Sequence, residues 1–469
     1  MESRISSVPP AVTPSAPPRP VAPRTKMLLE APILPTLLRL SAPNVLNLMA
    51  IVGMITFDGI FVGLLGASAL AGVSLAFPWV MLVQHTGASG MGGAVSSAIA
   101  RALGAGDRAR AEALASHAFA LAVILSAAFS GLMIPAAPLV FRWMGGRGEI
   151  LDAALAYSNV AFAGAISILM LNLLGNVVRG TGNMGVPATV IVGAVLAHVM
   201  LSPALIFGWG PFPALGPAGA GWGLAITFGV GSLVLVAYLR GSRSLVALAF
   251  RGVRVQPALF KEILRVGVPG MINVAITNLS VVVLTGIAGY LGRDTAIAYA
   301  MGARLEYILI PLAFGFGTAI VAMVGTNWGA KQFVRARRIA WIGGATSAVA
   351  CGAVGVFFAL FPRLWMGLFT EDAEIVRIGV SYLRIVGPIY ALYGLGMALY
   401  FATQGLGRVL LTVLANGVRL VASAAGALFA LSFLDAGTSG FFIAVASGFA
   451  VYGVLSVGAL LHISKGTHQ

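Results

Sequence analysis

Leu38-Arg39-Leu40-Ser41-Ala42-Pro43 returns later in the chain as Leu264-Arg265-Val266-Gly267-Val268-Pro269, so the chain contains two copies of one unit. Both copies consist mainly of long apolar segments. Bundles of this duplicated kind are common among membrane transporters, because two similar halves can rock about a shared central cavity. The two copies are 226 residues apart, and the same offset pairs Asn47 with Asn273 and Gly66 with Gly292. An offset of 225 pairs Gly104 with Gly329 and Gly180 with Gly405.

The composition excludes an ordinary soluble domain. Of the 469 residues, 59% are hydrophobic and only 9% are charged, whereas soluble domains carry about a quarter charged residues. The net charge of +15 is explained by loop charges that set topology and attract anionic lipid, so we expect no nucleic-acid partner. The single cysteine, Cys351, lies in an apolar run and is expected to be a small core residue.

The length of the apolar segments predicts an all-α membrane protein, since a helix of about 20 residues crosses a bilayer. Prolines within these segments, such as Pro43, favour bends. Twelve transmembrane helices are expected at residues 36–65, 69–97, 113–140, 151–175, 185–208, 218–239, 263–290, 295–323, 339–361, 374–402, 409–433 and 439–462.

Basic residues concentrate in the segments 240–265 and 331–338, which lie on one side of the membrane in this topology. The positive-inside rule therefore predicts cytoplasmic N- and C-termini in a multi-pass protein of the inner (plasma) membrane. With six spans in each copy, the halves are expected to be parallel repeats. The expected organisation is a disordered cytoplasmic tail (1–35), a first lobe (36–239), a cytoplasmic linker (240–262), a second lobe (263–462) and a C-terminal tail (463–469).

Asp58 is the strongest functional candidate, because it is the only acidic residue of the first span. A charge near the middle of a bilayer costs on the order of 3 kcal/mol or more, so ionisable groups there are functional candidates. A carboxyl group in such surroundings can exchange protons near neutral pH. The alternative is a structural aspartate bonded to nearby polar groups such as Thr56.

Glu306 is a second acidic candidate, expected in the eighth span two residues after Arg304. Residues two apart do not share a helix face, so Arg304 could pair with another helix while Glu306 faces a central cavity and attracts cationic compounds. The alternative is a salt bridge between helices near the membrane edge.

Apolar, aromatic and amide side chains are expected to make the remaining contacts to a substrate, since adaptable Met and aromatic surfaces suit broad specificity. Asn172 and Asn176 are four apart and share a helix face, where they line a site or join helices. Together with Glu306, the predicted substrate-binding residues are Met54, Phe57, Asn172, Asn176, Asn273 and Tyr299.

The chain resembles the multidrug and toxic compound extrusion (MATE) family over residues 36–462, and most closely its DNA-damage-inducible protein F-like branch. The stretches that carry the resemblance are Thr56-Phe57-Asp58-Gly59-Ile60-Phe61-Val62-Gly63-Leu64-Leu65-Gly66, Gly104-Ala105-Gly106-Asp107, Arg304-Leu305-Glu306-Tyr307, Pro311-Leu312-Ala313-Phe314-Gly315 and Val324-Gly325-Thr326-Asn327-Trp328-Gly329-Ala330. The resemblance implies two six-helix lobes in a V shape, and export of amphipathic, often cationic, compounds in exchange for H⁺ or Na⁺.

The resemblance also implies roles for particular residues. An acid at the position of Asp58 serves as a cation or proton site, and the first-span bend of the family matches Pro43 as a hinge. The sodium-linked pattern would have Asn and Asp at the positions of His198 and Ser202. Because an imidazole offers no hard oxygen ligand, His198 weakens a Na⁺ site and makes a proton relay with Asp58 possible. H⁺ is therefore expected to be the coupling ion, with no cofactor and no metal.

Two other classes of protein fit the sequence less well. A lipid-linked saccharide flippase of the same superfamily would favour a cationic cavity, whereas Asp58 and Glu306 point to cationic cargo. An intramembrane enzyme would need a clustered nucleophile, base or metal set, which the sequence lacks. The sequence therefore predicts a secondary multidrug antiporter that is not an enzyme and acts as a monomer on small organic cations.

Overall fold

The computed structural model describes residues 22–249, 255–434 and 436–465, and every regular element within them is a helix. The all-α fold class predicted from the sequence is therefore confirmed. The elements of the first repeat are α1 (Pro23–Glu30), α2 (Ile33–Gly63), α3 (Ala67–His85), the π-helical turn η1 (Thr86–Gly90), α4 (Met91–Gly104), α5 (Arg108–Trp143), α6 (Glu149–Ala163), α7 (Ala165–Gly180), α8 (Gly185–Phe207) and α9 (Pro217–Arg240). Those of the second repeat are α10 (Pro257–Tyr290), α11 (Arg293–Ala303), α12 (Glu306–Gly329), α13 (Phe333–Leu360), α14 (Pro362–Met366), α15 (Ala373–Val386), the 3₁₀ turn η2 (Gly387–Ile389), α16 (Tyr390–Gly405), α17 (Leu410–Phe433) and α18 (Gly437–Lys465).

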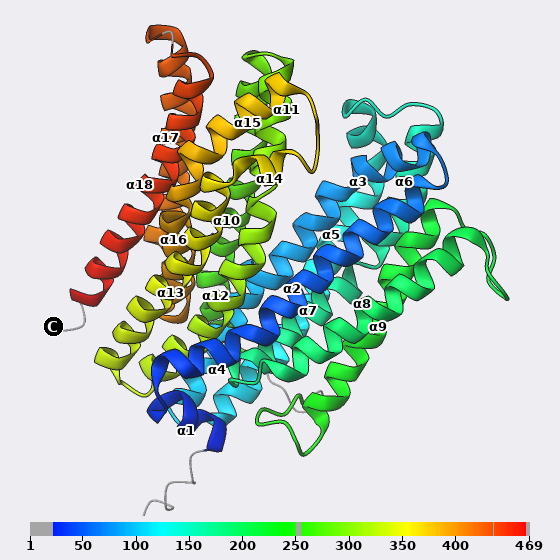
Figure 1. Cartoon of the computed structure of the whole chain (residues 1–469). Coiled ribbons are helices and arrows are strands. Elements are labelled where there is room, and N and C mark those ends of the chain that lie inside the picture. The colour runs from blue at the N-terminus through cyan, green and yellow to red at the C-terminus, as the bar shows by residue number, and fades with distance from the viewer. Residues whose placement is uncertain (1–21, 250–254, 435, 466–469) are drawn as a thin grey trace, which may run out of the picture.

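The described residues contain 11 helical segments that are long and apolar enough to cross a membrane. The number rises to 12 when α6 and α7, which are bent by 44° at their junction, are counted as one span. Figure 1 shows most helices of the first repeat, such as α5, α8 and α9, on one side and those of the second repeat, such as α13, α17 and α18, on the other, whereas α1 lies beside α12. The protein is therefore a multi-pass membrane protein.

Four of the expected spans contain a change of helix type or a short interruption, and they form two pairs of corresponding spans in the two repeats. The expected span 69–97 consists of α3, η1 and α4, and its counterpart 295–323 consists of α11 and α12. The span 151–175 is divided into α6 and α7, and its counterpart 374–402 into α15, η2 and α16. Interrupted helices at matching positions of two repeats often mark the substrate region of a transporter.

The duplication is visible in side-chain packing as well as in sequence. A methyl group added at Gly180 would lie 2.7 Å from the carbonyl oxygen of Ser96, and one added at Gly405 would lie 3.0 Å from that of Val321. Gly180 and Gly405 are counterparts, and so are Ser96 and Val321. Each repeat thus uses a glycine to let the same pair of helices approach closely.

The two repeats meet where α4 crosses α12, and corresponding glycines of the two helices form the contact. A methyl group at Gly104 would lie 2.0 Å from the carbonyl oxygen of Thr326, and one at Gly329 would lie 2.0 Å from that of Arg101. Arg101 and Thr326 occupy corresponding positions of the two repeats, as do Gly104 and Gly329. The crossing is therefore symmetric: each glycine contacts the same position of the other repeat. We call this region the linker end, meaning the end of the bundle at which α4 and α12 finish and the segment 241–256 joins α9 to α10 (Figure 1).

Charged groups add a second connection between the repeats at the linker end. Glu262 on α10 accepts hydrogen bonds from Arg101 on α4 at 3.1 Å and from Arg110 on α5 at 2.7 Å. Arg101 also donates to the carbonyl oxygen of Gly405 on α16 at 3.2 Å. The linker end is held closed by polar bonds as well as by backbone packing.

Three expected boundaries need correction. The prediction of a disordered tail over 1–35 is wrong for residues 22–35, because α1 forms and its Leu28 is buried in a cluster with α12, while residues 1–21 lie outside the described residues. Asn327 on α12 also donates to the Leu28 carbonyl oxygen at 2.9 Å. The linker is shorter than 240–262 because Pro257 begins α10. The C-terminal tail begins later than residue 463, because α18 continues to Lys465.

Candidate functional site

Asp58 lies on α2, and its carboxylate is bonded to two side chains of α8. The Nε2 atom of His198 lies 2.8 Å from Oδ1 and 2.9 Å from Oδ2 of Asp58. The hydroxyl of Ser202 donates to Oδ1 at 3.0 Å. Thr56, the neighbour that could have held a merely structural aspartate, instead donates to the carbonyl oxygen of Val52 in its own helix.

The sequence of α8 explains how two donors converge on one carboxylate. His198 and Ser202 are four residues apart, so they lie on the same face of the helix, and both are fully buried. Gly223 on α9 leaves room for the imidazole, since a methyl group there would lie 3.2 Å from its Cε1 atom. The Asp58 side chain is itself 22% exposed, so the cluster has a buried side and an accessible side.

The two ring nitrogens of His198 have different surroundings. Its Nε2 atom faces the carboxylate, while its Nδ1 atom is buried and has no hydrogen-bond partner among the described residues. A neutral imidazole carries its proton on one nitrogen only. In the neutral ring, donation to the Asp58 carboxylate therefore requires the proton on Nε2.

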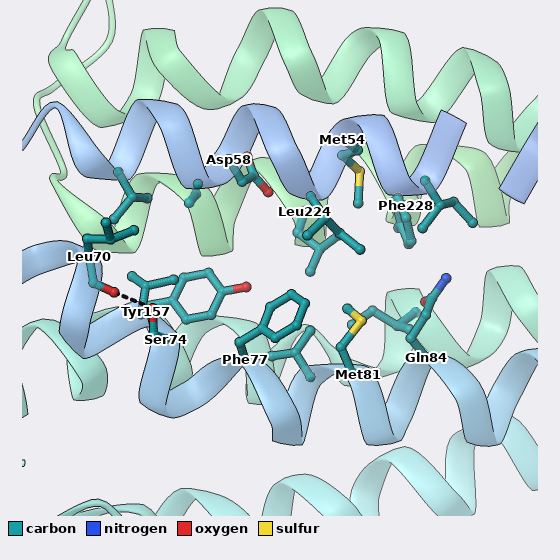
Figure 2. A pocket seen from close by; sticks show the side chains of 18 residues that line it. Met54, Asp58, Leu70, Ser74, Phe77, Met81, Gln84, Tyr157, Leu224 and Phe228 are labelled. Atoms are coloured by element: carbon teal, nitrogen blue, oxygen red, sulfur yellow. Dashed lines mark hydrogen bonds between the residues drawn. The ribbon is translucent and has the colours of Figure 1, made fainter. Parts of the chain in front are cut away.

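A cavity of about 210 Å³ begins at Asp58 and is enclosed by α2, α3, α6, α7 and α9. Figure 2 shows Met54 and Asp58 on α2 facing Phe77 and Met81 on α3 across this cavity. Among its described lining residues Asp58 is the only Asp, Glu, Lys or Arg. The cavity therefore combines an adaptable apolar wall with one acidic group.

Of the four predicted substrate residues of the first repeat, one lines this cavity. Met54 lines it, whereas Phe57 points elsewhere, is 47% exposed and stacks on Phe61 with ring centroids 6.2 Å apart. Asn172 donates to the side chain of Gln84, a lining residue, at 3.1 Å. The next amide, that of Asn176, donates to a backbone carbonyl oxygen in η1 at 3.1 Å, so both asparagines join α7 to the broken second span.

The predicted substrate residues of the second repeat do not line this cavity. Glu306 accepts a hydrogen bond of 3.4 Å from the hydroxyl of Tyr382 on α15. Tyr299 packs edge-on against the same Tyr382, with ring centroids 5.6 Å apart. Asn273 accepts a hydrogen bond of 2.8 Å from Asn416 on α17. These three residues belong to the interior of the second repeat, so the predicted set is divided between two regions.

The remaining predicted residue, Pro43, lies inside α2, which continues without interruption from Ile33 to Gly63. Its role as a hinge stays a prediction. Arg304 was expected to pair with another helix; its guanidinium carbon instead lies 5.4 Å from the centroid of the Phe369 ring, which belongs to the turn between α14 and α15.

Sequence reasoning missed several residues that shape the cavity, among them Tyr157 on α6 and Phe228 on α9. Aromatic residues in apolar spans are common, so nothing in the sequence distinguishes these two. Gln84 was the one detectable signal, because an amide within an apolar span needs a partner. Among the described residues, no group of three or more His, Cys, Asp or Glu side chains is arranged to hold a metal ion.

Comparisons with known proteins give a consistent picture. The model of the family described as MatE matches residues 43–204 and 269–429, one match in each repeat. An FAD transporter of Shewanella oneidensis is 28% identical and aligns over 80% of this chain and 82% of its own length. A probable multidrug resistance protein NorM of Thermotoga maritima is also 28% identical, over 75% of this chain and 76% of its own.

Solved structures with similar folds cover nearly the whole chain. One shows the outward-facing conformation of a multidrug resistance MATE family transporter of the MOP superfamily, with 26% identity, a TM-score of 0.87, and coverage of 96% of this chain and 99% of that chain. Another shows a MATE protein in the bent conformation, with 25% identity, a TM-score of 0.87, and coverage of 95% and 100%. The similarity extends through both repeats.

Proposed function

The chain belongs to the MatE family of multidrug and toxic compound efflux transporters, and on this premise we propose that it exports amphipathic organic cations in exchange for protons. The observation that carries the proposal is the bonding of Asp58 to His198 and Ser202 at the edge of an apolar cavity. In this proposal Asp58 binds the exchanged proton, and the cavity beside it receives the cargo.

The arrangement favours the carboxylate as the place where an incoming proton is held. A proton on Nδ1 of His198 would leave a buried N–H group without a partner, which costs about 1–3 kcal/mol. A proton on Asp58 needs no such unpaired group. His198 then acts as the fixed hydrogen-bond partner of Asp58, and it can pass the proton on when the surroundings of Nδ1 change.

Protonation of Asp58 would loosen the contact between α2 and α8. Hydrogen bonds to a charged group are worth about 1.5–3 kcal/mol, roughly twice those between neutral groups. A neutral carboxyl also donates one hydrogen bond and accepts fewer. Gain of a proton therefore weakens the bonds from His198 and Ser202, and α2 becomes free to move relative to α8.

Movement of α2 links the proton to the cargo, because α2 also forms one wall of the cavity. The present volume of about 210 Å³ is below the roughly 300–1,000 Å³ that ligand pockets usually offer. A drug-sized compound therefore needs a wider cavity than this one. We infer that cargo and proton compete through the position of α2, with Pro43 as the point at which α2 bends.

The charge in the cavity favours cationic cargo. Asp58 is its one charged lining residue among those described, and no basic side chain lines it. Anionic compounds, such as the cargo named for the Shewanella relative or a lipid-linked pyrophosphate, would meet a carboxylate without a compensating cation. The lining of the cavity therefore disfavours both an FAD carrier and a saccharide flippase.

We further propose that the linker end faces the cytoplasm, as the positive-inside rule predicts, and that the protein lies in the plasma membrane. The closed α4–α12 crossing would then make this an outward-facing state, and the solved outward-facing relative supports that reading. Because both halves belong to one chain, alternating access needs no second copy, which favours a monomer. Membership of the DNA-damage-inducible protein F-like branch stays a prediction.

The proposal is tested by efflux from proteoliposomes loaded with a fluorescent organic cation. Transfer into acidic buffer should drive the cation out, because protons entering through the transporter exchange for it. Asp58→Asn should reduce this efflux to background. Asp152→Asn, which changes an exposed carboxylate on α6, is the matched control and should leave it unchanged.

Two results would contradict the proposal. Efflux by Asp58→Asn at the wild-type rate under the same proton gradient would remove Asp58 from the coupling step. Efflux driven by a Na⁺ gradient at equal pH would replace the proton by Na⁺ as the coupling ion.

A further inference from the structure

A second and larger cavity lies at the linker end, away from Asp58. Its volume is about 610 Å³, and it is enclosed by the start of α2, the turn between α12 and α13, the first turns of α13, and the ends of α16 and α18. Its lining includes Lys331, Arg335, Arg337 and Arg338, and none of its described lining residues is acidic. The cavity is thus a concentrated basic site.

None of these four basic groups pairs with an acidic side chain among the described residues. No hydrogen bond or ion pair of the described residues involves the side chains of Lys331, Arg337 or Arg338, whereas other arginines are paired, such as Arg101 and Arg110 with Glu262. Four unneutralised cations within eight residues repel one another. A bound anion would relieve this repulsion.

Arg335 and the backbone supply further donors. The Arg335 guanidinium donates to the carbonyl oxygen of Ala31 through Nη2, while its Nε atom is buried without a hydrogen-bond partner among the described residues. Helix α13 begins here, and no side chain caps its first N–H groups. Free N–H groups and the positive end of a helix dipole favour anions, phosphate in particular. The donors and charges therefore match a phosphate group.

The rest of the cavity is apolar and lies at a level where membrane spans begin and end. Ile33 is the first residue of α2, Leu460 lies in the last turns of α18, and Trp328 in the last turn of α12. Tryptophan is enriched where membrane meets water. A ligand here would place an anionic group among the cations and an apolar portion against Ile33 and Leu460.

We propose that this cavity binds the phosphate headgroup of an anionic phospholipid from the surrounding bilayer. A phospholipid satisfies both halves of the site, since its phosphodiester meets the basic residues and its acyl chains continue along α2 and α18. Free inorganic phosphate satisfies only the basic half. This inference does not depend on the coupling ion or on the cargo.

The test measures lipid binding to the full chain in neutral detergent by native mass spectrometry. The lipids are phosphatidylglycerol and, for comparison, phosphatidylcholine. Wild-type protein should retain phosphatidylglycerol in preference to phosphatidylcholine. Each basic residue near a membrane surface contributes about fivefold in affinity, so Arg337→Gln with Arg338→Gln should weaken phosphatidylglycerol binding roughly 25-fold. Both side chains are exposed, and the variant should unfold at the wild-type temperature without lipid.

Arg142→Gln with Arg147→Gln is the matched control, since it removes the same charge from exposed arginines at the opposite end of the bundle. This control should bind phosphatidylglycerol as the wild type does. Equally weakened phosphatidylglycerol binding in both double variants would show a general charge effect and overturn the proposal. Wild-type binding by the Arg337→Gln, Arg338→Gln variant would also overturn it. Displacement of the lipid by inorganic phosphate at equal concentration would also overturn it, because the site would then recognise free anions.

Discussion

Gly329→Ala should open the linker end, because the glycine stands where α4 and α12 cross. The added methyl group would lie 2.0 Å from the carbonyl oxygen of Arg101, and 2.8 Å from its carbonyl carbon. Those atoms are backbone, so no side-chain rotation can relieve the clash. The helices must separate by more than roughly 1 Å to restore ordinary contact. The variant therefore opposes the closed crossing.

The size of the effect follows from the packing. Overpacking of a tight contact costs typically about 1–3 kcal/mol. If the linker end opens and closes during transport, this penalty falls only on the closed state. The ratio of open to closed molecules should then rise about 5-fold to 150-fold. Gly104→Ala should act in the same way, because a methyl group there would lie 2.0 Å from the carbonyl oxygen of Thr326.

The assay is a distance measurement between spin labels attached at Arg108→Cys on α5 and Val334→Cys on α13, two exposed positions at the linker end. Cys351 is the one native cysteine and is buried, so it does not compete for labelling. Gly329→Ala should add a longer-distance population that the parent lacks. Gly193→Ala, where a methyl group meets nothing within 4 Å, is the control. An unchanged distance distribution in Gly329→Ala would refute the reasoning.

Three further substitutions test other parts of the structure. Lys331→Gly should raise the stability by about 1 kcal/mol in thermal unfolding, because Lys331 has a φ of 60°, which strains a residue with a side chain; a lower melting temperature would contradict this. Glu262→Gln should lower the free energy of unfolding by about 2 kcal/mol, because two charge-assisted hydrogen bonds are lost. The difference in stability from the wild type should become smaller at high salt. A difference that does not depend on salt would argue against the ion pairs. Ser202→Ala should slow proton-driven efflux about tenfold, between the wild type and Asp58→Asn, since one donor to Asp58 is lost while the other remains; a wild-type rate would remove Ser202 from the site.

The positions of the membrane spans could be predicted closely from the sequence. The fifth span was expected at 185–208, and α8 runs from Gly185 to Phe207. Hydropathy depends on composition over a whole window, so it finds spans well and breaks within them poorly. The π-helical turn at Thr86–Gly90 and the junction of α6 with α7 were missed for that reason.

The candidate site was only partly predictable. Asp58 and His198 stood out as ionisable residues in apolar spans, yet 140 positions separate them. Their contact depends on how α2 packs on α8, which no local pattern encodes. Glu306 stood out by the same rule, but the packing of α11 on α15 brings Glu306, the first residue of α12, against Tyr382 rather than into the cavity at Asp58.

The amino-acid sequence alone determined the membrane class, the duplication and the chemical types of the candidate residues. These properties depend on composition and on spacing along the chain. Only the tertiary structure decided which candidates meet, which glycines join the repeats at Gly104 and Gly329, and where unpaired basic groups surround a cavity. The physical reason is that helix contacts involve residues from distant spans, and their geometry arises from the packing of the whole bundle.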